Sequence, residues 1–113
     1  MNPSEKIVQK QLDSYNARDL KSYLDCFAED VQVFSFPSGE MSYSGKAKLR
    51  TMYADIFENS PNLHCKLLNR IAFSNKVIDH EKVSGRKGVE ITELVAIYEI
   101  ENGLIAKAHF IRK

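Results

Sequence analysis

The second half of the chain constrains the fold most, because strand-like stretches separated by turn signals fill nearly all of it, and apolar and polar side chains alternate in residues 63–73. The four stretches are residues 63–73, 75–85, 91–101 and 104–112, and the turns SNK, GRKG and Asn102–Gly103 separate them. A period of two is typical of strands, and Asn–Gly between two such runs is a strong signal for a tight hairpin. We therefore predict four successive antiparallel strands.

The first half carries helical signals. Asn2, Pro3 and Glu5 form a helix start, with Asn2 as the N-cap, and apolar residues then recur at helical spacing. Asp19 can cap a second helix, whose apolar stripe comprises Leu20, Tyr23, Leu24 and Phe27. Two short strands follow, at 31–36 and 40–44. A third helix starts at Ser44–Gly45 and ends before Pro61.

The element order is therefore α-α-β-β-α-β-β-β-β, which predicts a single α+β domain over residues 1–113. The run LVAIY, residues 94–98, is apolar on both faces of its strand. Three short helices can cover only one side of the sheet, and a strand that is apolar on both sides needs cover on both. We expect a homodimer through the outer face of the sheet.

Composition excludes several classes of function. The 16 basic and 15 acidic residues are spread along the chain without a basic block, so neither nucleic acid nor a membrane is an expected partner. The N-terminus has no long apolar segment, and we expect a cytoplasmic protein. The cysteines, Cys26 and Cys65, lack metal-ligand spacing, and no glycine-rich phosphate loop is present, so we expect no metal and no cofactor.

The stretch NKVIDHEKVSG, residues 75–85, places charge in the middle of a strand. Asp79 and Glu81 share a face with Val77 and Val83, and that face is the better candidate for the interior. Burial and a like-charged neighbour both disfavour the ionised form of a carboxyl group. A carboxyl with a raised pKa can act as a general base or acid near neutral pH.

Three interpretations of Asp79 and Glu81 remain open at this point. They can belong to an ordinary cross-strand network with basic residues of neighbouring strands, namely Lys66, Arg70, Lys82 and Lys107. They can orient a ligand without catalysis, or they can be catalytic.

Other side chains are candidates for lining a pocket. His64 opens a strand, and Asn69 interrupts the apolar face of the same strand, where a buried amide needs partners. Aromatic side chains fall on the apolar stripes of the helices, and some of them must line any cavity there: Tyr15, Phe27, Tyr53 and Phe57. The alternative role for these four aromatic side chains is packing in the hydrophobic core.

Three segments, YNARDLKSYLDCFAEDV, GKAKLRTMYADIF and IYEIENGLIAKAHFI, resemble the nuclear transport factor 2-like superfamily. Within it the chain is similar to the small bacterial SnoaL-like and ketosteroid-isomerase-like proteins. The resemblance covers essentially the whole chain. It implies a cone-shaped α+β barrel, in which a curved antiparallel sheet wraps around three helices, with a pocket at the wide end and frequent dimerisation through the outer sheet.

The resemblance also permits a test of ketosteroid isomerase chemistry, which uses an Asp base and a Tyr with a protonated Asp. The corresponding positions are Ser35, Gln11 and Ala96, so none carries the required side chain. The same overlay points Ala96, Tyr98 and Phe110 inward, together with Leu94 and Ala108. Small alanines at inward positions leave space for a ligand.

We therefore expect a pocketed small-molecule protein. In the first hypothesis it is an isomerase, cyclase or lyase acting on an apolar carbonyl compound of polyketide or steroid type. Glu81 or Asp79 is then the base, and Tyr15, Tyr53 or Asn69 donates to the oxyanion. The alternatives are a non-catalytic ligand-binding homodimer of the same fold and a dimeric interaction module without a pocket.

Overall fold

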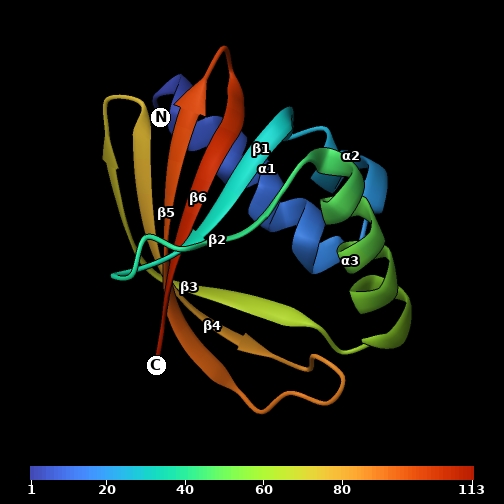
Figure 1. Ribbon diagram of the computed structural model, residues 1–113. Coiled ribbons are helices and arrows are strands. Elements are labelled where there is room, and N and C mark those ends of the chain that lie inside the picture. Colours follow the sequence, from blue (N-terminus) through green and yellow to red (C-terminus); the bar gives the residue numbers. More distant parts are fainter.

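The computed structural model describes all residues 1–113 and places three helices on one face of a six-stranded sheet (Figure 1). The elements are α1 (Pro3–Ala17), α2 (Leu20–Leu24), β1 (Phe27–Ser35), β2 (Met41–Ser44), α3 (Lys46–Asn59), β3 (His64–Phe73), β4 (Lys76–Ser84), β5 (Thr92–Glu101) and β6 (Leu104–Arg112). This order confirms the predicted α+β arrangement. No helix is long and apolar enough to cross a membrane.

The helix starts follow the local chemistry of the sequence. The Asn2 side chain accepts a hydrogen bond from the Glu5 backbone N–H at 2.7 Å, and Asp19 accepts one from the Ser22 N–H at 3.2 Å. Helix α2 is shorter than predicted, because Phe27 is the first residue of β1 rather than part of a helical stripe. There β1 pairs with β6, and the Ile105 N–H donates to the Cys26 carbonyl at 2.8 Å.

The strands lie in the order β2-β1-β6-β5-β4-β3, and the sheet curves around the helices as an open cone (Figure 1). Every neighbouring pair is antiparallel except β1 and β6, which are parallel. The predicted curved antiparallel sheet is therefore confirmed in the main, with one parallel pair that the sequence did not indicate. Hairpin turns set the direction of β3 to β6, whereas most of the chain separates β1 from β6 and no turn fixes their relative direction.

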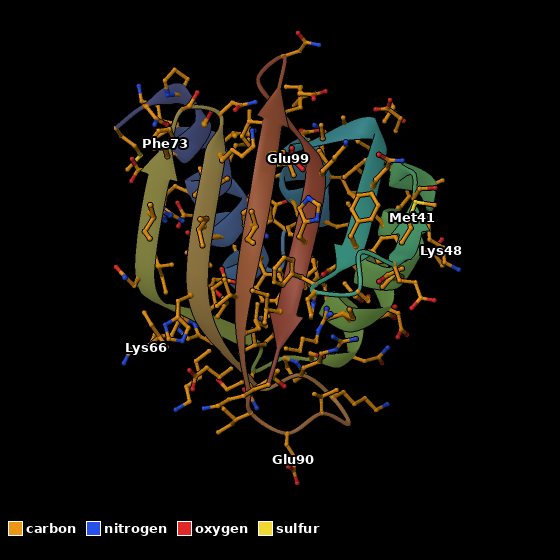
Figure 2. The ribbon with its side chains drawn as sticks, turned by 60° about the vertical axis from the view of Figure 1, so that its left-hand side comes forward. Met41, Lys48, Lys66, Phe73, Glu90 and Glu99 are labelled. Atoms are coloured by element: carbon orange, nitrogen blue, oxygen red, sulfur yellow. The ribbon has the colours of Figure 1, made fainter.

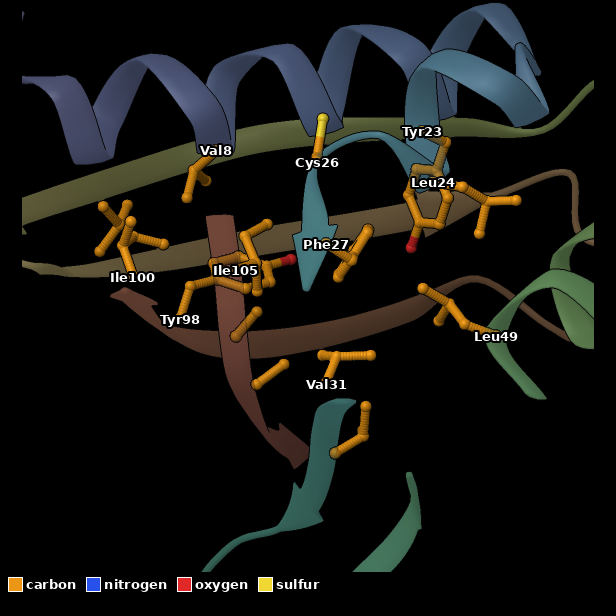
Figure 3. Packing of buried hydrophobic residues seen from close by; sticks show 14 of the residues in the cluster. Val8, Tyr23, Leu24, Cys26, Phe27, Val31, Leu49, Tyr98, Ile100 and Ile105 are labelled. Atoms are coloured by element: carbon orange, nitrogen blue, oxygen red, sulfur yellow. The ribbon is translucent and has the colours of Figure 1, made fainter. Parts of the chain in front are cut away.

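The core lies between the helices and the concave face of the sheet. Val8 of α1, Leu49 of α3, Val31 of β1 and Ile105 of β6 are at most 1% exposed and lie in one cluster (Figure 3). Each such side chain contributes about 1.5–3 kcal/mol when it leaves water. Val77 of β4 belongs to the same cluster, so this packing also fixes the helices against the strand that carries the two central carboxylates.

A β-bulge in β3 changes which residues face the core. The pairing with β4 shifts between Leu67 and Asn69, so the side chains after the bulge point to the opposite face from the one that strict alternation predicts. Arg70 consequently faces inward, whereas Ile71 and Phe73 are 56% and 73% exposed. Asn69 is exposed, so the prediction that it lines a pocket is wrong.

The outer face of the sheet is free of helices (Figure 2). Apolar side chains of the central strands, Val95, Ile97 and Ile111, are half-buried there. They lie among two histidine–carboxylate pairs, His80 with Glu93 at 2.8 Å and His109 with Glu99 at 2.7 Å. The homodimer through this face stays a prediction.

Candidate functional site

Asp79 and Glu81 both point into the molecule from β4, as the alternation predicted. Their exposed fractions are 0% and 5%. They lie on the face of the sheet that the helices cover, but the side chains around each are different.

Asp79 is fully paired. The Arg70 guanidinium donates to both carboxylate oxygens, Nε to Oδ1 at 2.7 Å and Nη2 to Oδ2 at 2.9 Å. Its remaining Nη1 donates to the Gln9 side chain of α1 at 2.7 Å. This bidentate geometry is the strongest form of an arginine–carboxylate contact, and it fastens α1 to the edge of the sheet. The cross-strand network considered from the sequence is therefore correct for Asp79.

Glu81 has no such partner, since none of the ion pairs in the protein includes it. Burial and, to a smaller extent, the charge of Asp79 raise the pKa of Glu81 to about 7, although a hydrogen bond with the Cys65 thiol and the charge of Arg70 oppose the shift. A carboxyl group with this pKa is protonated and ionised in comparable amounts near neutral pH. It has the property required of a general base or acid.

Glu81 lines a cavity of about 170 Å³ between the helices and the sheet. The cavity is bounded by α1, α2 and α3 on one side, and by β3 to β6 and the loop 85–91 on the other. That loop and the C-terminal end of β6 are both at the lower end of the molecule in Figure 1. The lining side chains are Gln11, Leu12, Tyr15, Tyr23, Tyr53, Cys65, Glu81, Val83, Arg86, Val89, Glu90, Thr92, Leu94, Tyr98, Phe110 and Arg112.

Four tyrosines form much of the cavity wall. The ring centroids of Tyr15 and Tyr53 are 6.2 Å apart, and those of Tyr23 and Tyr53 are 4.7 Å apart. Burial raises the pKa of Tyr15, Tyr23 and Tyr98 above the ordinary value for a phenol. These hydroxyl groups therefore stay protonated at all physiological pH values, so they are available as hydrogen-bond donors.

Comparison with known proteins assigns the chain to a family. The model of the SnoaL-like domain family matches residues 8–108. The chain belongs to the SnoaL-like domain family. No curated protein sequence matches it.

Solved structures agree with this assignment at the level of the fold. A cystatin-fold protein from Novosphingobium aromaticivorans is 24% identical to this SnoaL-like domain, covers 99% of each chain and gives a TM-score of 0.85. A candidate ketosteroid isomerase from Kribbella flavida is 17% identical, covers 98% of this chain and 78% of its own, and gives 0.80. A candidate polyketide cyclase from Sinorhizobium meliloti is 20% identical, covers 97% and 99%, and gives 0.76.

The SnoaL-like domain brings about half of the sequence-predicted site residues together. The predicted residues that line the cavity are Tyr15, Tyr53, Glu81, Tyr98 and Phe110. Phe27, Phe57 and Ala96 are buried in the core and are not among the lining residues, so their predicted place in the pocket wall is not observed. His64 is exposed at the start of β3, and Asp79 is occupied by Arg70.

Sequence reasoning missed Gln11. It considered this position only as an unfilled ketosteroid isomerase role, yet Gln11 lies in the cavity wall and is 6% exposed. Its Oε1 is the only buried side-chain oxygen or nitrogen without a hydrogen-bond partner. An unpartnered buried acceptor costs free energy and needs an explanation.

Three further lining residues were also missed as site residues. Cys65, which the sequence analysis considered only as a possible metal ligand, lies beside Glu81, and burial raises the pKa of its thiol, with the Glu81 charge adding to the shift. Arg86 was read only as part of the turn GRKG, and Arg112 only as the end of a strand. Nothing in the local sequence pattern distinguishes them, because the curvature of the sheet brings them to the cavity.

Proposed function

We propose that this SnoaL-like domain is an isomerase, cyclase or lyase in which Glu81 transfers a proton on a small, largely apolar carbonyl compound. The observation that carries the proposal is Glu81 itself, a buried carboxyl group without a cationic partner that faces an apolar cavity. No group of three or more His, Cys, Asp or Glu side chains is placed to hold a metal ion.

The surrounding groups suit removal of a proton from carbon next to a carbonyl. Ionised Glu81 takes the proton, and the electron pair moves onto the carbonyl oxygen. A protonated tyrosine, Tyr15 or Tyr98, then donates a hydrogen bond to the developing oxyanion. Protonated Glu81 returns the proton at another carbon, which completes an isomerisation without any other reactant.

The size of the cavity favours a compact substrate. A cavity of about 150 Å³ in another protein holds a benzene molecule. The cavity here, of about 170 Å³, suits one ring with a substituent that extends to the mouth, rather than a four-ring steroid. This supports the small apolar ligand among the expected substrates over the steroid-like one.

The structural neighbours support the same classes of chemistry. Two of them are a candidate ketosteroid isomerase and a candidate polyketide cyclase. The positions Ser35 and Ala96 provide no acid or base here, and the Ser35 hydroxyl lies 3.2 Å from that of Ser42. We therefore assign the base to Glu81, on a different strand.

The test is isomerisation of cyclohex-3-en-1-one to its conjugated isomer, with incorporation of solvent deuterium followed by NMR. We expect the rate to rise with pH as Glu81 ionises near pH 7, and to fall at least 10²-fold in Glu81→Gln. Glu101→Gln, which removes an exposed carboxylate outside the cavity, is the matched control and should retain the full rate. Equal rates for both variants would exclude Glu81 as the base.

The unpartnered Gln11 acceptor also supports the alternative, a non-catalytic binding protein. In that case ligands bind in the cavity but neither isomerise nor exchange deuterium. Binding with no turnover in the wild type would favour this alternative.

A further inference from the structure

Two arginines lie at the mouth of the cavity without carboxylate partners. Arg86 comes from the loop 85–91 and Arg112 from the end of β6, and both are exposed lining residues. Neither belongs to any ion pair, although Glu90 lines the same cavity. The mouth therefore carries two guanidinium groups whose charges are not neutralised by the protein.

Both guanidiniums act electrostatically on one side chain, Tyr43 of β2, which is not among the cavity-lining residues. Burial raises the pKa of Tyr43, and Arg112 and Arg86 both oppose that shift. Arg112 is further held over the Phe110 ring, with its Cζ 4.8 Å from the ring centroid. Stacking of this kind orients the planar guanidinium and leaves its edge free for an anion.

The wall also contains the unpartnered acceptor. Gln11 projects from α1, is 6% exposed, and its Oε1 accepts no hydrogen bond from the protein. Apolar and aromatic side chains, among them Leu12, Leu94 and Phe110, line the same cavity. A ligand that fills it meets the side-chain amide of Gln11 in the wall and positive charge at the mouth.

We propose that the cavity takes a compact apolar carboxylate that also carries a hydroxyl group, with the carboxylate at Arg86 and Arg112 and the hydroxyl at the side-chain amide of Gln11. This inference rests on the cavity of the proposed function and names its class of ligand. A guanidinium pair binds a planar carboxylate through parallel hydrogen bonds, which gives both affinity and orientation. The orientation places the middle of the ligand, rather than its charged end, against the buried wall that contains Glu81.

The experiment is calorimetric titration with three probes: 4-hydroxyphenylacetate, its neutral amide 4-hydroxyphenylacetamide, and phenylacetate, which lacks the hydroxyl donor. We expect 4-hydroxyphenylacetate to bind at least about tenfold more tightly than either of the others. The double variant Arg86→Gln/Arg112→Gln should remove the preference for the acid over the amide. Gln11→Leu should remove the preference for the hydroxylated acid over phenylacetate.

The matched control for the arginines is Lys66→Gln/Lys87→Gln, which removes two exposed positive charges outside the cavity lining. It should leave all three affinities unchanged. Equal binding of acid and amide to the wild type would overturn the inference, as would a loss of acid binding in the lysine control equal to that in the arginine variant. Failure of every probe to bind at millimolar concentration would overturn it as well.

These outcomes are separate from those of the proposed function, because binding is measured without turnover. The titrations are repeated with Glu81→Gln, which should still prefer the acid over the amide. An acid preference together with no deuterium exchange would leave the ligand class standing and reject catalysis. Deuterium exchange that depends on Glu81, together with no preference for the acid, would support catalysis and reject the ligand class.

Discussion

Asp79 and Glu81 lie two residues apart on the same face of β4, yet only one of them is free to react. The difference comes from the strands on either side. Asp79 lies opposite Arg70 on β3, whereas Glu81 lies opposite Leu67 on β3 and Leu94 on β5. One carboxylate therefore meets a guanidinium and the other meets apolar side chains, so the same residue chemistry produces a structural anion and a proton-transfer candidate.

The bulge at Leu68 produces this difference. If Leu68 paired regularly instead of forming the bulge, Asn69 would lie opposite Asp79, Arg70 would turn to the outer face, and Asp79 would be buried without a cation. The Arg70–Asp79 pair also acts on Glu81. The charge of Asp79 raises the pKa of Glu81 and the charge of Arg70 lowers it, so the two effects partly cancel.

The largest expected effect is loss of the structural pair. Asp79→Asn leaves the Arg70 guanidinium, 8% exposed, without its counter-charge, and should reduce the free energy of unfolding by about 3–5 kcal/mol. Urea unfolding at pH 7 measures it. The double variant Arg70→Met/Asp79→Asn removes the uncompensated charge and should recover a large part of the loss. A change below about 0.5 kcal/mol in Asp79→Asn would contradict the assignment of Asp79 as structural.

Glu81→Gln should have the opposite sign. The pKa of Glu81 is raised from 4.5 to about 7 in the folded protein, so ionisation opposes folding as the pH rises through this range. At pH 8 the amide should be more stable than the wild type by about 3 kcal/mol, and the difference should shrink toward pH 4.5. Thermal unfolding from pH 5 to 8 checks it. A variant that is less stable at pH 8 would show that Glu81 is paired.

Gln11→Leu tests the cost of burying an unpartnered group that carries no charge. It removes an acceptor that is buried without a partner, and should increase the free energy of unfolding by about 1–2 kcal/mol at every pH. The absence of pH dependence separates it from Glu81→Gln. Gln9→Leu is the matched control, because Gln9 accepts from Arg70 and its loss should destabilise the protein.

The smallest effect concerns Cys65. Burial raises the pKa of its thiol, and the Glu81 charge adds to the shift, so Glu81→Gln should lower that pKa. Alkylation by iodoacetamide at about pH 8.5 should then become several-fold faster at Cys65. Mass spectrometry of both cysteines checks this. Cys26, whose pKa burial raises to about 11 without a contribution from Glu81, is the internal control and should react at an unchanged rate.

Much of the fold was predictable because its signals are local. The caps at Asn2 and Asp19, and the turn at Asn102–Gly103 with both residues at positive φ, act within a few residues of the chain. The inward direction of Asp79 and Glu81 followed from alternation alone. Phe27 was predicted on a helix but lies in β1, because a short apolar stretch fits either a helical or a strand pattern. The pairing of Phe27 with Ile105 of β6 decides for the strand.

The sequence by itself determined the order of elements, the domain class and the strand that carries the candidate base. Only the tertiary structure decided which carboxylate is paired, which aromatic side chains border the cavity, and that Gln11, Arg86 and Arg112 join them. The physical reason is range. Caps, turns and alternation depend on neighbours in the chain, whereas a charge or a cavity is defined by groups that the curved sheet and its bulge bring together from distant segments.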